Sequence, residues 1–217
     1  KEGTQYMGKI KSILKENKRW ILALFCVIIF LDLLEDVLNN EIMNFDSTVY
    51  NFIISFKSNS LNNIFKFITF FGSSIPLISI CIISFLFIKN KKIPMYISIN
   101  LIVTAIFNLL LKNIIRRNRP VGYRLVEETG FSFPSGHSMA SMAFYGLIIY
   151  LVFKYVKNKY AKIALCTFLS ILIASIGISR IYLGVHYTSD VLAGFMISLS
   201  YLTLFTHLIK NDLELEN

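Results

Sequence analysis

Residues 134–155, PSGHSMASMAFYGLIIYLVFKY, join a short polar start to a long apolar run. Proline and serine favour the beginning of a helix, because proline needs no helical N–H partner and serine can cap the free N–H groups of the first turn. The apolar run is close to the roughly 20 residues that a helix needs to cross a membrane. The stretch therefore predicts a membrane helix over 135–155, with Ser135, Gly136 and His137 at its beginning.

The rest of the chain has the same apolar character. Hydrophobic residues make up 55% of the 217 residues and charged residues only 16%, and the mean hydropathy is +0.61. A soluble domain carries about 25% charged residues, so an ordinary soluble protein is excluded. We expect an all-α, polytopic membrane protein, a six-transmembrane-helix bundle. The other five spans are predicted at 20–38, 64–88, 93–115, 161–178 and 186–209.

The predicted domain covers residues 20–209, between a basic N-terminal segment, 1–19, and a short C-terminal tail, 210–217. Inside the second span, Gly72 and Pro76 predict a kink, since proline removes a helical hydrogen bond. Between the first two spans, apolar side chains recur with helical spacing, which favours a short helix in the membrane interface. These side chains are Phe45, Val49, Phe52, Ile53 and Phe56. A loop with chance periodicity is the alternative.

Basic residues predict the orientation of the bundle in the membrane. Lysine and arginine concentrate on the cytoplasmic side of membrane proteins. They collect before the first span, after the second and after the fourth, so both termini should be cytoplasmic. The segment after the third span would lie outside, although it carries Lys112, Arg116, Arg117, Arg119 and Arg124. Phosphate binding would explain positive charge on that side.

Three short motifs lie at the predicted external ends of the third to sixth spans. They are Lys112, Arg119 and Pro120; Pro134, Ser135, Gly136 and His137; and Ser179, Arg180, His186 and Asp190. Transfer of a phosphoryl group requires the charge on its oxygens to be held while nucleophile and leaving group stay in line. Lysine and arginine side chains supply that charge, and a helix N-terminus offers free N–H groups. Arg116 and Arg117 are interpreted as ordinary interfacial side chains.

His186 and Asp190 are four residues apart, so they share a face if the sixth helix has begun at His186. A carboxylate bonded to one imidazole nitrogen fixes the tautomer and leaves the other nitrogen free as a nucleophile. Two histidines and an aspartate would also suit zinc, but the fixed positive charge of Lys112 and Arg180 favours an anion instead. His207 has no partner nearby in the sequence and is interpreted as structural.

In this order, the three motifs resemble those of the type 2 phosphatidic acid phosphatase superfamily, whose membrane members hydrolyse lipid phosphates and pyrophosphates. The resemblance implies that His186 attacks phosphorus, that Asp190 orients it, and that His137 protonates the leaving oxygen and later activates water. Phosphate binding would fall to Lys112, Arg119, Ser135, Gly136 and Arg180. It also implies a six-span all-helical fold, no metal and no other cofactor.

The leading substrate on this resemblance is undecaprenyl pyrophosphate at the external face, with phosphatidylglycerophosphate and phosphatidate as alternatives. Phosphotransfer to a lipid and a non-enzymatic lipid-phosphate binder or flippase are further alternatives. Membrane lipids are the expected partners. Nucleic acid is not, because the net charge of +9 is scattered over membrane flanks, and no obligatory protein partner is inferred. The loop with Tyr123, Arg124, Glu127 and Glu128 is where headgroup selection is expected.

Asp32, Glu35 and Asp36 stand near the end of the first apolar segment. Carboxylates within a membrane span are costly to insert. They either mark the point where the first helix leaves the membrane or face inward and pair with Arg116 or Arg117.

Overall fold

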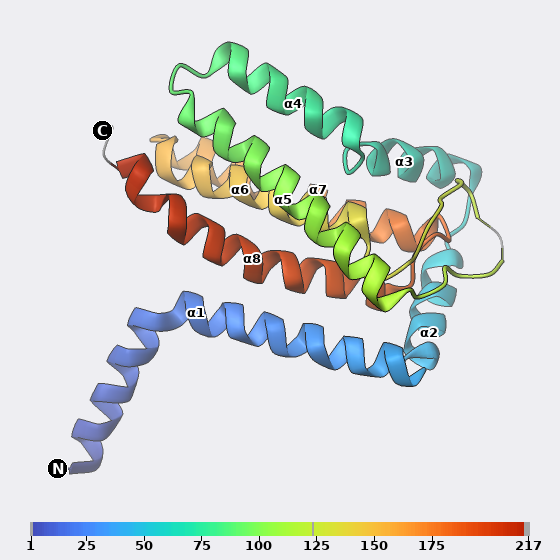
Figure 1. Cartoon of the computed structure of the whole chain (residues 1–217), viewed down its shortest axis with the longest axis horizontal. Coiled ribbons are helices and arrows are strands. Elements are labelled where there is room, and N and C mark those ends of the chain that lie inside the picture. The colour runs from blue at the N-terminus through green and yellow to red at the C-terminus, as the bar shows by residue number, and fades with distance from the viewer. Residues whose placement is uncertain (1, 123, 215–217) are drawn as a thin grey trace.

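All regular secondary structure in the part of the chain that the computed structural model describes is helical. The described residues are 2–122 and 124–214, with the side chains of 2–16 and 214 not described. Within these ranges the elements are α1 Glu2–Asn39, α2 Met43–Ile54, α3 Asn59–Phe70, α4 Ser74–Phe87, α5 Lys92–Ile115, α6 Gly136–Tyr155, α7 Lys159–Tyr182 and α8 Thr188–Glu214 (Figure 1). The predicted all-α class is therefore confirmed.

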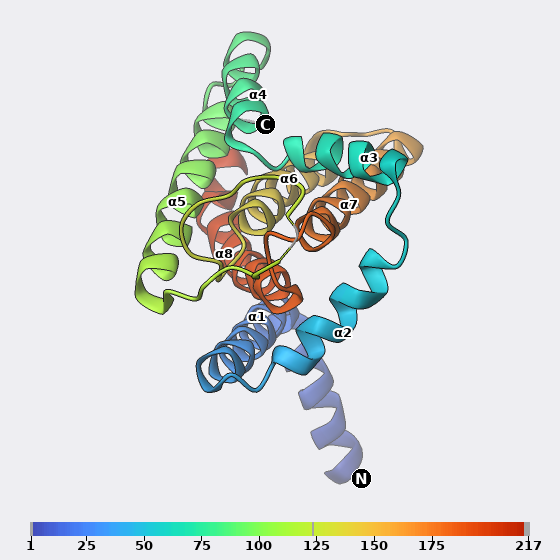
Figure 2. The ribbon, with the colours of Figure 1, turned by 90° about the vertical axis from the view of Figure 1, so that its right-hand side faces the viewer.

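Helix α6 lies at the centre of the bundle, packed against α5, α7 and α8 (Figure 2). Its buried side chains Phe144 and Leu147 join Ile176 of α7 in the main apolar core. Around this centre, α1 packs along α8, α3 packs on α7, and α4 packs on α5. The short helix α2 contacts α7 and α8 from the side. The core thus fixes the relative positions of the four helices that carry the motifs.

The number of membrane spans is four or five by length and apolar composition of the described residues. Helices α5, α6, α7 and α8 each qualify, and α3 and α4 together make a bent fifth span. The predicted count of six is not reached, because α1 does not qualify. Its last turns contain the three carboxylates of Asp32, Glu35 and Asp36, which raise the cost of burial in hydrocarbon.

The predicted kink in the second span is confirmed as a break between α3 and α4, whose axes differ by 44°. The break lies before Pro76, which fits the first turn of α4 because its missing N–H costs nothing there. Gly72 lies in the break. A Cβ atom at Gly72 would lie 2.7 Å from Ile176 Cγ2 and 3.1 Å from His137 Cδ2. The absence of a side chain therefore lets this chain segment approach His137.

Helix boundaries place the third motif differently from the prediction. Helix α7 continues past residue 178 to Tyr182, so Arg180 lies on its last turn. Helix α8 begins at Thr188 rather than at residue 186 and continues past residue 209. His186 therefore lies in the connection between α7 and α8, and the expected tail beyond 214 lies outside the described residues.

The short helix predicted between the first two spans is α2, which confirms its helical character. Phe52 and Phe56 on and beside it are exposed at 66% and 59%, whereas Asp46 is buried. Together with the 116–135 segment, α2 covers the end of the bundle where α5 and α7 end and α6 and α8 begin (Figure 1). All three motifs lie at this end.

Candidate active site

His186 is held between a carboxylate and a guanidinium. Its Nδ1 lies 3.3 Å from Asp190 Oδ2, and its Nε2 lies 3.1 Å from Arg119 Nη1. Because a guanidinium only donates, Nε2 must accept, and the proton is on Nδ1 facing Asp190. Burial lowers the pKa of His186 to about 4, although its hydrogen bond to Asp190 opposes that shift. At neutral pH the ring is therefore neutral, with its lone pair on Nε2.

Asp190 is fully buried and accepts hydrogen bonds from several directions. Besides His186, its Oδ2 accepts from the Tyr187 N–H at 2.9 Å and from the Ser132 hydroxyl. Its Oδ1 accepts from Arg117 Nη1 at 2.7 Å. A carboxylate with this many donors stays ionised and fixed in orientation. Asp190 can therefore hold the imidazole of His186 in one position.

A cavity of about 390 Å³ brings the two histidines of the motifs together. His137, on the first turn of α6, and His186 both contribute to its wall. The charged side chains of the wall are Lys112, Arg119 and Glu128. A group bound in this cavity would thus meet two imidazoles and two cations.

Lys112 and Arg119 reach the cavity from the end of α5 and from the segment that follows it. Lys112 Nζ donates to the Phe131 carbonyl at 2.5 Å. Arg119 donates to the carbonyls of Thr129, Gly130 and Val185 at 2.9–3.0 Å. Both cations therefore also hold the shape of the loops around the cavity.

Arg180 is present at the same end of the bundle but does not line the cavity. It is 1% exposed, and its Nη1 donates to Thr69 Oγ1 at 2.7 Å. Its Nη2 forms an ion pair with Glu128. Since Glu128 does line the cavity, its carboxylate lies between Arg180 and the space where a ligand would bind.

The Pro-Ser-Gly-His turn caps the beginning of α6 and brings its backbone close to the cavity. Ser135 is fully buried, its Oγ accepts from the Ser138 N–H at 3.4 Å, and its own N–H donates to the Asp190 carbonyl at 3.0 Å. Gly136 lines the cavity, and a Cβ there would lie 2.9 Å from Asn108 Oδ1. Ser135 thus organises the turn, while Gly136 lies at the cavity surface. Asn108, which donates to the Pro134 carbonyl at 3.1 Å, was not found from the sequence.

Arg117 and Asp46 form a second network behind His186, and the interpretation of Arg117 as an interfacial side chain was wrong. Its Nη2 donates to Asp46 Oδ2 at 2.8 Å while its Nη1 donates to Asp190, and it stacks over the Tyr187 ring at 4.0 Å. Asp46 also accepts from the Ser189 N–H and hydroxyl at 2.8 and 2.7 Å. Arg117 therefore pairs with these carboxylates rather than with those at the end of α1.

The structure agrees with the interpretation of Arg116 as an interfacial side chain and of His207 as a structural residue. Arg116 is exposed at the end of α5. The His207 ring packs edge-on against Trp20, with 5.1 Å between ring centroids. Tyr123, one of the residues expected to select a headgroup, lies outside the described residues.

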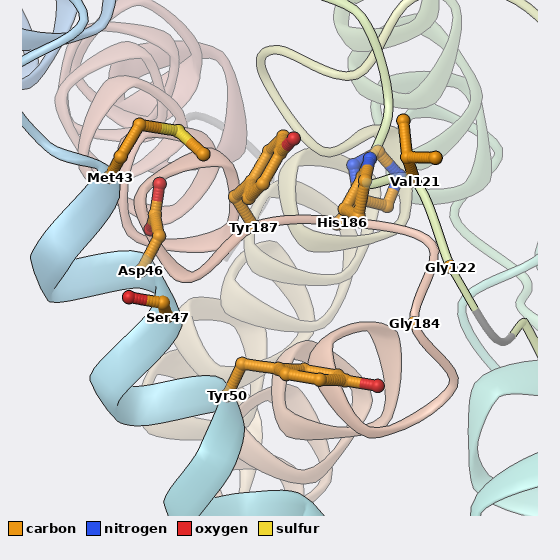
Figure 3. Close-up of a pocket in the computed structure, with 10 residues that line it drawn as sticks. Met43, Asp46, Ser47, Tyr50, Val121, Gly122, Gly184, His186 and Tyr187 are labelled. Atoms are coloured by element: carbon orange, nitrogen blue, oxygen red, sulfur yellow. The ribbon is translucent and has the colours of Figure 1, made fainter.

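A second cavity, of about 480 Å³, lies between α2 and the connection that carries His186. Asp46 and Tyr50 of α2 lie on one side of it, with His186 and Tyr187 on the other (Figure 3). His186 contributes to the walls of both cavities. The helix α2 is thus an integral part of the site, although no motif residue lies on it.

Replacing Asp46 by asparagine should destabilise the fold by about 3 kcal/mol, because it removes one partner of a buried ion pair. Any catalytic rate at this site should fall about tenfold, since Arg117 would no longer be held against Asp190 and a small misplacement is enough for that loss. Chemical unfolding in mild detergent and steady-state kinetics would measure the two effects. Asp32→Asn, at an exposed position of α1, is the control. Equal effects of both substitutions would contradict the role of the Asp46 network.

Comparisons with known proteins agree with the motifs. A family model described as PAP2 superfamily matches residues 94–214. Phosphatidylglycerophosphatase B of Bacillus subtilis (strain 168) is 32% identical over 175 residues, which cover 78% of this chain and 86% of that protein. The crystal structure of the first transmembrane PAP2 type phosphatidylglycerolphosphate phosphatase from Bacillus subtilis is 28% identical, with a TM-score of 0.80 over 87% of this chain and 96% of that one. Aquifex aeolicus LpxE shares the fold, with a TM-score of 0.60 at 21% identity over 72% of this chain and 93% of that one.

Proposed function

Because this chain belongs to the PAP2 superfamily, as its three motifs indicated, we propose that it is a membrane lipid phosphatase that works through a phosphohistidine on His186. The observation that best supports the proposal is that His186, His137, Lys112 and Arg119 all line the same cavity. A nucleophile, a second proton-transferring group and cations for the phosphate oxygens are the parts that phosphoryl transfer requires.

In the first step, the lone pair of His186 Nε2 attacks phosphorus. A P–N bond forms while the bond between phosphorus and the lipid oxygen breaks. His137, which enters this step as an imidazolium beside the anionic substrate, gives its extra proton to that oxygen as it leaves. Asp190 keeps the Nδ1 proton of His186 in place and stabilises the positive charge that develops on the ring. Arg119 now donates to His186 Nε2, so it must turn to the phosphate oxygens as the ligand enters.

In the second step, water attacks the phosphohistidine. His137, now neutral, takes the proton of that water, the P–N bond breaks, and inorganic phosphate is released. Lys112, which lines the cavity, and Arg119 and Arg180, once they have left their present partners His186 and Glu128, hold the oxygens in both steps. Because these side chains supply the positive charge that a metal ion supplies elsewhere, we propose that the reaction needs no metal.

The name of the relative from Bacillus subtilis favours phosphatidylglycerophosphate as substrate. That relative is matched over most of its length, so we place this lipid first. Undecaprenyl pyrophosphate, which the sequence favoured, is the second candidate. The three cations at the site suit the larger negative charge of a pyrophosphate.

We propose that the site faces the outside of the cell and that both termini are cytoplasmic. The connections 88–91 and 156–158 lie at the end of the bundle away from the site (Figure 1). In or beside them lie Lys89, Lys91, Lys92, Lys154, Lys157, Lys159 and Lys162, as expected for cytoplasmic loops. Helix α1 begins and α8 ends at that same end (Figure 1). Leu24, Phe25 and Ile28 of α1 are exposed at 61%, 58% and 55%, which supports α1 as a sixth, lipid-facing span.

The purified protein in detergent should release inorganic phosphate from a lipid phosphate in the presence of EDTA. The test compares phosphatidylglycerophosphate, phosphatidate and undecaprenyl pyrophosphate, and the ratio of their kcat/KM values chooses the substrate. Loss of release with EDTA, restored by a divalent metal, would contradict the metal-independent mechanism. Transfer of phosphate to an added lipid alcohol in place of release would favour phosphotransfer. Binding of all three lipids with no turnover would favour a binder or flippase.

A further inference from the structure

Glu128 is the carboxylate partner of Arg180, the most deeply buried cation at the site. Its carboxylate pairs with Arg180, and its Oε2 lies 3.7 Å from Arg119 Nη2. Both arginines belong to the motifs that would bind phosphate. A carboxylate and a phosphate offer a guanidinium the same kind of acceptor pair, so both compete for the same donors.

The environment of Glu128 keeps its carboxylate charged. Burial raises the pKa of Glu128, but Arg180 and Arg119 outweigh that effect and hold the pKa below its ordinary value. The side chain of Glu128 is 27% exposed, whereas that of Arg180 is 1% exposed. The carboxylate can therefore leave toward water, while the guanidinium cannot.

Arg180 also has unused donor capacity. Its Nε is buried and has no hydrogen-bond partner among the described residues. A buried guanidinium N–H without an acceptor is costly, and Glu128 and Thr69 engage only the two terminal nitrogens. The pair in the empty site is thus incomplete, which suits a partner that is exchanged during turnover.

We propose that Glu128 is an exchangeable internal anion that covers Arg180 in the empty site, gives way to the phosphoryl group, and returns to displace the product phosphate. The proposal rests on the proposed function, because it takes phosphate as the ligand of Arg180 and Arg119. Glu128 acts through the arginines and is a positioning residue, not a catalytic one.

An internal competitor multiplies the affinity for phosphate by the fraction of time for which it leaves the arginines free. It also shortens the life of the product complex, because the carboxylate is tethered beside the site and rebinds without diffusion. The same competition weakens substrate binding. The advantage of Glu128 therefore lies in turnover. Its removal should slow the release of product phosphate and tighten the binding of phosphate and substrate.

The experiment compares the wild type, Glu128→Gln and Glu127→Gln in detergent micelles with inorganic phosphate as the probe. Glutamine keeps the size of Glu128 and one acceptor for Arg180 but removes the charge. Glu127 is the exposed neighbour. Phosphate affinity is read from the rise in unfolding temperature with phosphate concentration, which does not depend on lipid turnover. We expect Glu128→Gln to bind phosphate about tenfold more tightly than the other two.

Kinetics on the preferred lipid give the second readout. Glu128→Gln should lower KM and kcat together and make phosphate a stronger product inhibitor. Unchanged phosphate affinity in Glu128→Gln, with phosphate still binding to the wild type, would overturn the proposal and leave the proposed function standing. A lower unfolding temperature of Glu128→Gln without any gain in phosphate affinity would mean that Glu128 has a structural role only. No phosphate binding in any of the three proteins would overturn the proposed function itself.

Discussion

Replacing His186 by alanine should reduce phosphate release to below about one thousandth of the wild-type rate, because a missing nucleophile removes the covalent path altogether. His186 Nε2 is the nitrogen that lies free of Asp190 and beside Arg119. The same variant should form no phosphohistidine. Brief reaction with lipid carrying labelled phosphate, followed by quenching in alkali, would detect the acid-labile adduct in the wild type alone.

The control for His186→Ala is His207→Ala, since His207 packs on Trp20 away from the site. His207→Ala should keep its phosphate release and its phosphohistidine. Phosphate binding should survive in His186→Ala, because Lys112, Arg119 and Arg180 remain. If His186→Ala kept a tenth or more of the activity, another group would have to be the nucleophile and the proposed mechanism would fail.

The helices that carry the motifs were predictable because their signals are local. Residues 93–115 and 135–155 are long apolar runs with a proline or serine at their beginning, and α5 and α6 match them within a residue. The meeting of the three motifs at one end of the bundle could also be predicted from the order and direction of the spans. Because consecutive spans run in opposite directions, the end of α5, the start of α6, the end of α7 and the start of α8 lie on one side (Figure 1).

The network behind His186 was not predictable in the same way. Asp46 lies 71 residues before Arg117 in the chain and is brought to it by the packing of α2 against α7 and α8. No spacing rule connects a residue of a separate short helix to a motif.

Charge explains the remaining differences between sequence and structure. The basic segment 112–124 suggested an anion site, and the sequence assigned Lys112 and Arg119 of that segment to the substrate. The structure shows that part of the positive charge is balanced internally, by Glu128 on Arg180 and by Asp46 on Arg117. A count of charges in a sequence does not reveal such pairs, because each depends on which loop residue the fold brings within reach of which cation.

Replacing His137 by glutamine should slow the release of a lipid alcohol by about 10² to 10⁴, the usual contribution of a general acid. The loss should be smaller, within about tenfold, for a phosphate ester of nitrophenol, because a weakly basic leaving group needs little protonation. His137 shares the cavity with His186, which is the geometry that this assignment requires. Single-turnover rates of leaving-group release from both esters, in the wild type, His137→Gln and His207→Gln, would make the comparison, because they report the first step alone.

The second step separates His137 from a residue that only shapes the cavity. If His137 also activates water, His137→Gln should accumulate phosphohistidine from the nitrophenyl ester, because formation of the adduct survives while its hydrolysis slows. A structural role would slow both steps alike, and no adduct would build up. Equal losses for the two esters would likewise contradict the acid role. The leaving-group dependence and the trapped adduct thus test the two proton transfers of His137 independently, on the same variant.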